Sequence, residues 1–600
     1  MKSIKLLFSG LLSLSLLSAC NDDFLDRYPE ADRSEATFWT SKSDFELYVN
    51  TLYPKYLSGF GAVWQDGNVQ PKGINEAQIV YGDIITDNAV TTSYSKVTNN
   101  DYISYLTGGT GSGGWNWENL RQINYFLNNY AKTAISPEEY NVYLGEIYFF
   151  KALEYFDKVK LFGDVPWLTK DLQTDSEELY APRNKREDVI DSVLMVLEKS
   201  YGLLPEGSSN SGRINKDMVL FMKSRIGLYE GTYRKYHGGE NAQKYLELSA
   251  SASLELMQSG KYEITTGDPN TVYNSLFAQE DYASNKEIVY WRGYNSELTL
   301  GSAFSRYFTQ NNRNGGSGAT RSLIDDYLCK DGESISTSTL YNGKNSIELE
   351  FKDRDPRLAQ TISIPGEYSL RPGIGMAGST ANPLPGIKGS NTASGNLCVT
   401  GYRLAKWFYD NPADWARTTN GLQAAPILRY AEILLNYAEA KAELGQISQT
   451  ILDQTINVLR ERVAMPALRL GNEPTDPRLD EIYATYVGYT VTPVLREIRR
   501  ERRVEMAFED VRWDDLVRWK ALKLLSMPVE GMKFNQKDYP SIKVGTDIIL
   551  SGDGLILPYA QILNNQNRTF DERMYHFPIP ITELVLNPNL EQNPGWETAK

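Results

Sequence analysis

The chain contains very little histidine and cysteine, and this scarcity narrows its chemistry. Its 600 residues include only His237, His576 and three cysteines, and no HExxH, Walker A, GxSxG or paired CxxC pattern occurs. Zinc sites and Ser-His-Asp triads are built from such residues. The sequence therefore argues against metal-dependent and nucleophilic hydrolases. A glycoside hydrolase needs only two carboxylates about 5 to 10 Å apart, so 76 acidic residues leave that class open.

The chain also has no surplus of positive charge. Lys and Arg number 62 against 76 Asp and Glu, which gives a formal net charge of -14, and no basic patch stands out along the sequence. Because phosphate backbones repel such a chain, nucleic-acid binding is excluded. With 41% hydrophobic, 23% charged and 12% aromatic residues, the composition is that of a folded globular protein.

Long apolar runs are absent except at the start of the chain. Lys2 and Lys5 precede an apolar run at residues 6–17, which is typical of a secretory signal peptide and too short to span a bilayer. Small residues then lead into Cys20, as in the lipobox of bacterial lipoproteins. We expect residues 1–19 to be removed and Cys20 to be acylated, which would anchor the protein to a membrane. Secretion without a lipid is the alternative.

Two other cysteines, Cys329 and Cys398, make no disulfide framework, and whether they pair stays open at this point.

Helical periodicity dominates two long stretches of the chain. Ser136-Pro137-Glu138-Glu139 combines an N-cap, a first-turn proline and a capping glutamate, and it predicts a helix that ends near Gly163. A capping box at residues 43–46 predicts an earlier helix that Pro54 stops. Short turns between further helices predict antiparallel helix pairs. The expected helices span 115–132, 186–201, 216–236, 242–259, 426–444, 449–464 and 494–524.

Between residues 262 and 424 the helical pattern gives way to Gly, Ser, Asn, Pro and Thr. One strand is predicted at 287–291, and interspersed aromatic residues argue against disorder. We expect ordered loops carried on a helical scaffold. The mature chain then has a helical part at 20–261, a loop-rich part at 262–424 and a second helical part at 425–600.

A glycine-rich segment at 109–114 matches the spacing of dinucleotide-binding loops, with a strand-like stretch at 102–106 before it and a helix expected from Trp115. A Rossmann unit also needs a second parallel strand and an acidic residue about 20 positions later. The chain instead continues from helix to helix, so we expect a flexible loop here.

The most highly charged stretch lies at residues 496–518. Arg500, Arg502, Arg512 and Arg518 have an acidic residue three or four positions away, which supports a helix. Arg496, Arg499 and Arg503 have none and must find solvent, a neighbouring helix or a ligand. An anion site on these three arginines is one interpretation. We favour a structural network of Arg and Glu around Trp513 and Trp519.

Five blocks in order along the chain resemble the SusD/RagB family of nutrient-binding lipoproteins. They are the lipobox with residues 20–26 and Phe38-Trp39, the helix and turn at 143–166, the helix at 428–440, the charged helix and following segment at 501–516, and the C-terminal segment at 578–595.

The resemblance implies a mainly α fold: a divergent tetratricopeptide-like scaffold of helix pairs, with long irregular loop insertions and a few short strands. Residues 20–600 would form one such domain, without catalysis or cofactor. The resemblance further implies an outer-membrane lipoprotein that is exposed at the cell surface. Asp22 and Asp23 resemble the surface-export signal of such lipoproteins. It would capture an oligosaccharide and deliver it to a SusC-like TonB-dependent transporter. A surface glycosidase and a peptide-binding member of the family are the alternatives.

A sugar site needs aromatic rings for the C–H face of a pyranose and polar side chains for its hydroxyls. Two loop regions combine both kinds of residue. The first supplies Asp87, Asn88, Tyr94 and Tyr102, and lies where family members commonly bind ligand; the second supplies Trp291, Tyr294, Arg306 and Tyr307. We predict these eight residues as ligand-binding.

Overall fold

The computed structural model describes residues 39–60, 77–91, 97–98, 102–133, 135–207, 212–310, 317–363, 384–385, 397–417, 419–540, 542–562 and 568–597. The predicted signal peptide, Cys20 and Tyr94 lie outside the described residues. Within the described residues, no helix is both long enough and apolar enough to cross a membrane.

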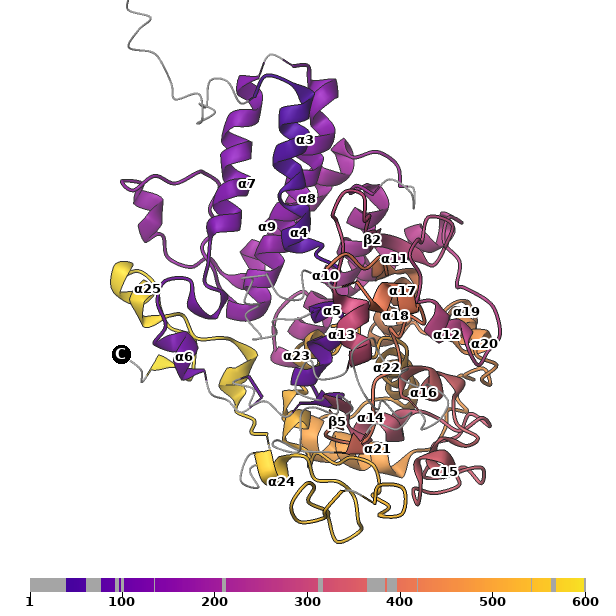
Figure 1. Cartoon of the computed structure of the whole chain (residues 1–600). Coiled ribbons are helices and arrows are strands. Elements are labelled where there is room, and N and C mark those ends of the chain that lie inside the picture. The colour runs from indigo at the N-terminus through magenta and orange to yellow at the C-terminus, as the bar shows by residue number, and fades with distance from the viewer. Residues whose placement is uncertain are drawn as a thin grey trace, which may run out of the picture.

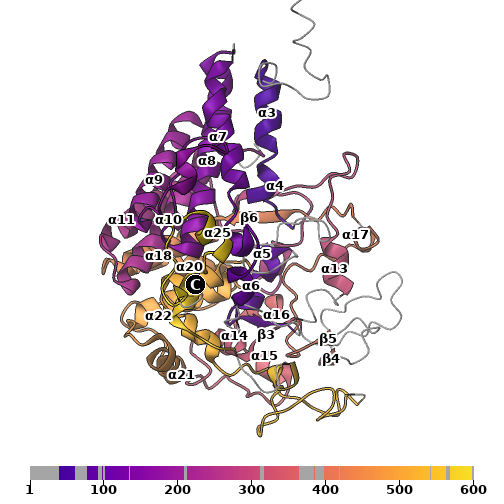
Figure 2. The same ribbon diagram turned by 90° about the vertical axis from the view of Figure 1, so that its left-hand side faces the viewer.

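A row of long helices forms the scaffold, as the periodicity predicts. Figure 2 shows α7 to α11 and α18 fanning out side by side, and α8 packs on α9, α10 on α11, and α11 on α18. The scaffold helices are α3 (Lys42–Asn50), α7 (Glu118–Asn129), α8 (Pro137–Phe162), α9 (Arg186–Leu203), α10 (Lys216–His237), α11 (Ala242–Gln258), α18 (Tyr430–Glu443), α22 (Pro493–Glu505) and α23 (Arg512–Arg518).

The sequence signals at the ends of α8 are confirmed. Ser136 is the N-cap, its backbone N–H donates to Glu139 Oε2 at 3.2 Å, and Gly163 ends the helix with φ of 71°. The capping box of α3 lies two residues before its predicted place. Ser41 caps this helix together with Asp44, because Asp44 occupies the third helical position from Ser41.

The close contact between α10 and α11 depends on glycine. A Cβ atom at Gly227 of α10 would lie 2.7 Å from the backbone nitrogen of Ser249 in α11, and one at Gly231 would lie 2.8 Å from that of Leu246. Real Cβ contacts are longer, so any side chain here would force the two helices apart. Glycine therefore sets the spacing of the α10–α11 pair.

Three predicted helices are interrupted in the structure. Residues 425–429 form strand β6 instead of the start of α18, and Thr455 leaves helical geometry between α19 (Gln449–Gln454) and α20 (Ile456–Arg462). The predicted helix at 494–524 breaks after α22, where Phe508 and Asp510 have φ of 59°. Phe508 N–H donates to Asp83 Oδ2 at 2.7 Å, so a tertiary hydrogen bond replaces a helical one at this break.

Short elements fill the spaces around the scaffold. The strands pair in twos: β1 (Ala89–Val90) with β3 (Gly318–Ala319), β2 (Ile288–Arg292) with β6 (Ala425–Arg429), both antiparallel, and β4 (Leu384–Pro385) with β5 (Leu397–Cys398), parallel. The strand expected at 287–291 is thus confirmed as β2.

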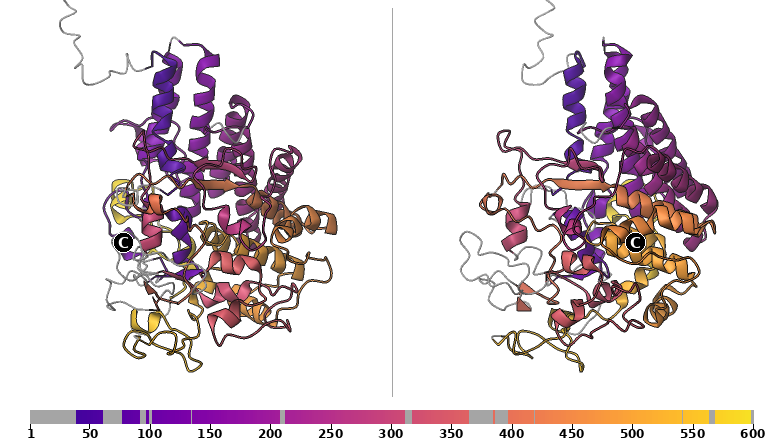
Figure 3. Two further views of the ribbon diagram at one scale, coloured as in Figure 1. Left: turned by 45° about the vertical axis from the view of Figure 1, so that its right-hand side comes forward. Right: turned by 90° about the vertical axis from the view of Figure 1, so that its right-hand side faces the viewer.

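The remaining helices are short. They are α4 (Tyr53–Tyr56), α5 (Gln78–Tyr81), α6 (Ile103–Leu106), α12 (Val272–Ser275), α13 (Phe304–Gln310), α14 (Arg321–Asp326), α15 (Ile347–Phe351), α16 (Pro356–Thr361), α17 (Pro412–Trp415), α21 (Pro477–Ile482), α24 (Tyr559–Ile562) and α25 (Ile581–Leu586), with single 3-10 or π turns at 82–85, 112–114, 130–132, 177–180, 483–487, 522–526 and 572–575. Several of them carry the loop-rich part, which lies on the opposite side of the molecule from α9 and α11 (Figure 3).

The prediction of a strand at 102–106 is wrong, because these residues include the helical turn α6. The glycine-rich segment after α6 packs on the C-terminal helix α25: Gly111 N–H donates to Glu583 Oε1 at 3.3 Å, and Figure 1 shows α6 beside α25. The helix after it begins at Glu118, not at Trp115. The strand that a dinucleotide-binding unit requires before its glycine loop is therefore absent from this described part of the chain.

One hydrophobic core joins both ends of the described chain. It extends from Trp39 to Trp596 through the scaffold helices and the loop-rich part. Cys329 and Cys398 are both buried and free, which settles the open question of their pairing. The fold is mainly α with a few short strands, as predicted.

Candidate functional site

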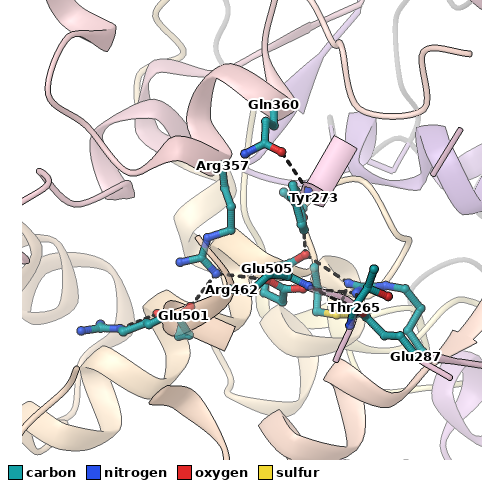
Figure 4. A network of polar contacts seen from close by, with 12 residues as sticks. Thr265, Tyr273, Glu287, Arg357, Gln360, Arg462, Glu501 and Glu505 are labelled. Atoms are coloured by element: carbon teal, nitrogen blue, oxygen red, sulfur yellow. Dashed lines mark hydrogen bonds and ion pairs between the residues drawn. The ribbon is translucent and has the colours of Figure 1, made fainter. Parts of the chain in front are cut away.

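A buried network of Arg and Glu side chains joins the loop-rich part to the scaffold helices (Figure 4). At its centre the Glu505 carboxylate is within 2.6 Å of Arg462, 3.0 Å of Arg357 and 3.2 Å of Arg429. Burial alone would raise the pKa of Glu505, but these three guanidinium groups hold it well below its usual range. The network therefore keeps its charges and locks α16, α20, α22 and β6 together.

The arginines without a local acid find partners on other elements. Arg496 pairs with Asp480, Arg499 with Glu443, and Arg503 with Asp87 and Asp326. The prediction of a structural network is confirmed for all three. Two arginines bind acidic residues that are farther away in the sequence than the partners expected three or four positions away. Arg502 binds Asp515, and Arg512 binds Asp87.

The described residues of the first predicted ligand cluster are buried, and two of them, Asp87 and Asn88, pair with arginines of the charged stretch. Asp87 receives a bidentate pair of hydrogen bonds from Arg512, both at 2.8 Å, and Asn88 is bonded to Asp83 and Arg503. Tyr102 is fully buried and packs edge-on against Phe577 and Trp596. These three side chains are buried and already paired or packed, so in this structure they support the scaffold.

The second predicted cluster lies at the surface of the loop-rich part. Tyr294 is half-buried, and its ring lies parallel to that of Phe60 at 6.3 Å. Phe60 N–H donates to the Tyr294 hydroxyl at 3.1 Å, and the Arg292 guanidinium lies 5.6 Å from the Tyr294 ring. These contacts fix the ring in one orientation while part of it stays accessible.

Trp291 is the other half-buried ring of this cluster. It lies edge-on to Tyr282 with a centroid distance of 5.8 Å. Its ring also covers the backbone of Gly293, where an added Cβ would lie 2.6 Å from the indole. Gly293 thus lets the Trp291 ring lie flat against the chain.

An aromatic column connects Tyr294 to the core. Phe304 of α13 stacks on Phe60 at 4.0 Å, and Trp407 meets Phe60 edge-on at 5.8 Å. Trp407 has φ of 79°, a conformation that costs a non-glycine residue about 1 to 3 kcal/mol and persists only where the surroundings impose it. Its indole N–H donates to Phe508 O at 2.9 Å, so the loop face is tied rigidly to the Arg–Glu network.

Arg306 completes the described part of the predicted cluster. Its guanidinium donates to the Trp415 carbonyl at 3.3 Å and is half-exposed. Tyr307 lies in α13, but its side chain is outside the described residues. Tyr294 is thus connected to α13 through the rings of Phe60 and Phe304, and Arg306 lies in the same helix.

The same face holds residues that the sequence reasoning missed. Phe408 and Tyr409 are half-buried, and Phe408 packs 5.8 Å from Trp415. The Tyr409 hydroxyl donates to Glu280 at 2.7 Å, and Asn411 donates to the same carboxylate. A cluster of aromatic residues at 407–415 was the available signal. We call Trp291, Tyr294, Arg306, Phe408, Tyr409 and Asn411 the loop-rich face. All six are partly exposed residues of the loop-rich part, and together they include rings and donors and acceptors for hydroxyl groups.

Among the described residues, no group of three or more His, Cys, Asp or Glu side chains is arranged to hold a metal ion.

Two family models match this chain. The model described as "SusD family" matches residues 278–596, more than half of the chain, and the model described as "Starch-binding associating with outer membrane" matches residues 23–228.

Individual relatives match over most of their length. SusD-like protein P38 from Formosa agariphila is 24% identical over 567 residues, which cover 90% of this chain and 96% of the relative. Among solved structures, a SusD-like carbohydrate binding protein from Bacteroides fragilis superposes with a TM-score of 0.68 at 24% identity, over 92% of this chain and all of the other. A second SusD-like protein from Bacteroides fragilis gives a TM-score of 0.67 at 24% identity, over 95% and 100%. At this identity the structural likeness shows the fold.

Proposed function

This chain belongs to the SusD family, and on that premise we propose that it is a glycan-binding protein of the cell surface. It captures oligosaccharides and releases them to a SusC-like TonB-dependent transporter in the outer membrane. Acylated Cys20 would hold it at the membrane, as its lipobox suggests. The match to a family described as starch-binding and associating with the outer membrane supports this assignment.

The observation that carries the proposal is the loop-rich face. Tyr294 presents part of a ring that is held by Phe60, and Arg306, Tyr409 and Asn411 supply polar groups in the same loop-rich part of the chain. Aromatic pairs contribute roughly 0.5 to 1.5 kcal/mol each, so by analogy one ring holds a sugar weakly. Two or three rings on one face are needed for useful capture, and this face supplies Trp291, Tyr294 and Phe408.

A binding role without bond cleavage fits the fixed geometry of this face. The Glu280 carboxylate is engaged by the Tyr409 hydroxyl and the Asn411 amide. We infer that the protein hands its ligand on unchanged.

Incubation of the purified mature protein with a panel of neutral polysaccharides tests this function. We expect retention in affinity electrophoresis without release of reducing ends, and weaker retention after Tyr294→Ala. New reducing ends would instead establish a glycosidase. Binding to peptide pools without binding to any glycan would establish a peptide-binding protein.

A further inference from the structure

An open groove lies on the helical scaffold, away from the loop-rich face. It has a volume of about 610 Å³ and is lined by Tyr48 of α3, four residues of α7 and two residues of the loop that follows α8. The groove is open to solvent, and its volume is within the range of ligand-binding clefts. Figure 1 shows α3 and α7 as neighbouring upright helices, whereas α13 and α17 of the loop-rich face lie on another side in Figure 2.

Two tyrosines form the aromatic wall of this groove. The rings of Tyr48 and Tyr125 are nearly parallel, with centroids 6.2 Å apart, and both are half-buried. Behind them lies the buried ring of Trp39, 5.2 Å from Tyr48 and 6.2 Å from Tyr125. The Tyr48 hydroxyl donates to Gln122 O at 2.8 Å. The wall is therefore rigid, and each tyrosine keeps part of its surface in contact with solvent.

Hydrogen-bond donors and acceptors also line the groove. Asp171 accepts hydrogen bonds from Arg121 at 3.1 Å and from Gln173 at 3.2 Å. Arg121 is 66% exposed against 13% for the Asp171 side chain, so its remaining N–H groups face solvent. The groove thus offers donors from arginine and glutamine and an acceptor from aspartate next to an aromatic wall.

The loop that carries Asp171 is held in place from below. The buried Asn124 amide donates to Leu168 O at 3.2 Å and to Lys170 O at 3.1 Å. The Lys151 ammonium binds the Asn124 carbonyl at 2.8 Å and also reaches Leu168 O. Asp171 is therefore positioned by the scaffold and not by its own loop alone, which is what a preformed site requires.

The charges of the groove indicate the ligand class. Arg121 is already paired with Asp171, and Glu118 adds a second carboxylate to the lining. The lining therefore carries no positive surplus, and an anionic ligand would be repelled. A neutral polyol with an apolar face matches both the tyrosine wall and the mixed donors and acceptors.

We propose that this groove is a second glycan subsite, which takes a neutral pyranose unit of the ligand class proposed above. This inference rests on the proposed function, because it supposes that the protein meets glycans. Its two tyrosines stack against the sugar, while Arg121, Gln173 and Asp171 bind its hydroxyls. Two separated subsites on one chain would retain a long glycan better than one, because the second binding event becomes intramolecular.

The test uses the full mature protein and neutral hexasaccharides of glucose, mannose, galactose and xylose. Isothermal titration and saturation-transfer NMR measure affinity and the number of bound hexasaccharides per chain. In a Trp291→Ala, Tyr294→Ala background, which removes the rings of the loop-rich face, we expect binding at the groove to persist. In that background Tyr125→Ala weakens it roughly 2- to 10-fold, whereas Tyr125→Phe, which keeps the ring, leaves it within twofold of the background.

A second variant keeps the test independent of ring packing. Arg121→Ala alters an exposed side chain, so it should lower the affinity of the groove for the hexasaccharide without affecting folding. The control is Lys170→Ala on the same loop, because Lys170 pairs with Glu178 outside the groove lining; it should leave binding unchanged.

The outcomes separate this inference from the proposed function. If the wild type binds none of the hexasaccharides, both are overturned. The groove is not a glycan subsite if the wild type binds a hexasaccharide but the background variant binds none. The same conclusion follows if binding persists in the background variant and neither Tyr125→Ala nor Arg121→Ala changes it. In both cases the proposed function stands.

Discussion

Replacing Asp87 by asparagine removes the charge that Arg503 and Arg512 share. Asp87 Oδ2 lies 3.0 Å from Arg503 and 2.8 Å from Arg512, and all three side chains are buried. Breaking such a pair leaves uncompensated charge in the interior, which costs about 3 to 5 kcal/mol. Arg503 keeps Asp326 as a partner, so we expect a loss of about 3 kcal/mol in the free energy of unfolding.

The pH dependence of the loss in unfolding free energy gives a second measure of the Asp87 ion pairs. Burial alone would raise the pKa of Asp87, but Arg503 and Arg512 outweigh it and lower the pKa to about 2. A carboxyl whose pKa is lower in the folded state stabilises the fold above its unfolded pKa, and this stability is lost as pH falls toward 2. The difference between wild type and Asp87→Asn should stay constant from pH 7 to 5 and shrink from about pH 4 downward.

Urea unfolding monitored by tryptophan fluorescence at pH 7, 5, 4 and 3 measures both effects. The control is Glu263→Gln, because Glu263 pairs with Lys286 at an exposed site; its cost should stay below about 1 kcal/mol. The reasoning fails if Asp87→Asn unfolds at the wild-type midpoint. It fails equally if the variant is as stable as the wild type but no longer binds glycan, since Asp87 would then act on a ligand.

Three further predictions address the site, the scaffold and the histidines. Trp291→Ala should reduce glycan retention roughly 2- to 10-fold with an unchanged circular dichroism spectrum; unaltered retention would remove this ring from the site. Gly227→Ala should lower the unfolding free energy by about 1 to 3 kcal/mol, because the added methyl meets the α11 backbone, and a wild-type urea midpoint would contradict that contact. Burial lowers the pKa of His237 to about 4 and that of His576 to about 3. Both should therefore be neutral in the fold, and their contribution should fall as pH drops below about 6.5. Against His576→Gln, the wild-type advantage should shrink between pH 7 and 5 in thermal unfolding; a constant difference would refute this.

Local signals predicted the ends of individual helices well. The proline and capping glutamate after Ser136 and the glycine after Phe162 mark the two ends of α8, because caps and helix breakers act within one turn. The same signals could not find the break after α22. Phe508 leaves the helix there because its N–H bonds to Asp83, a residue 425 positions away.

The candidate site was predicted only in part. Tyr294 and Arg306 belong to the loop-rich face, but the first cluster was chosen from composition and spacing, which do not report burial. Asp87 and Asn88 have the residue types of a sugar site, and the fold uses them to pair Arg503 and Arg512. The groove between α3 and α7 had no sequence signal, since it joins Tyr48 to Asp171 across two helices.

The sequence alone determined the helical class, the family blocks and the structural role of the arginine stretch, because periodicity, capping and charge spacing all act over a few residues. The tertiary structure decided which acid each arginine meets and which rings remain at the surface. Those outcomes depend on the packing of segments hundreds of residues apart, where burial and electrostatic pairing are properties of the assembled core and of no single segment.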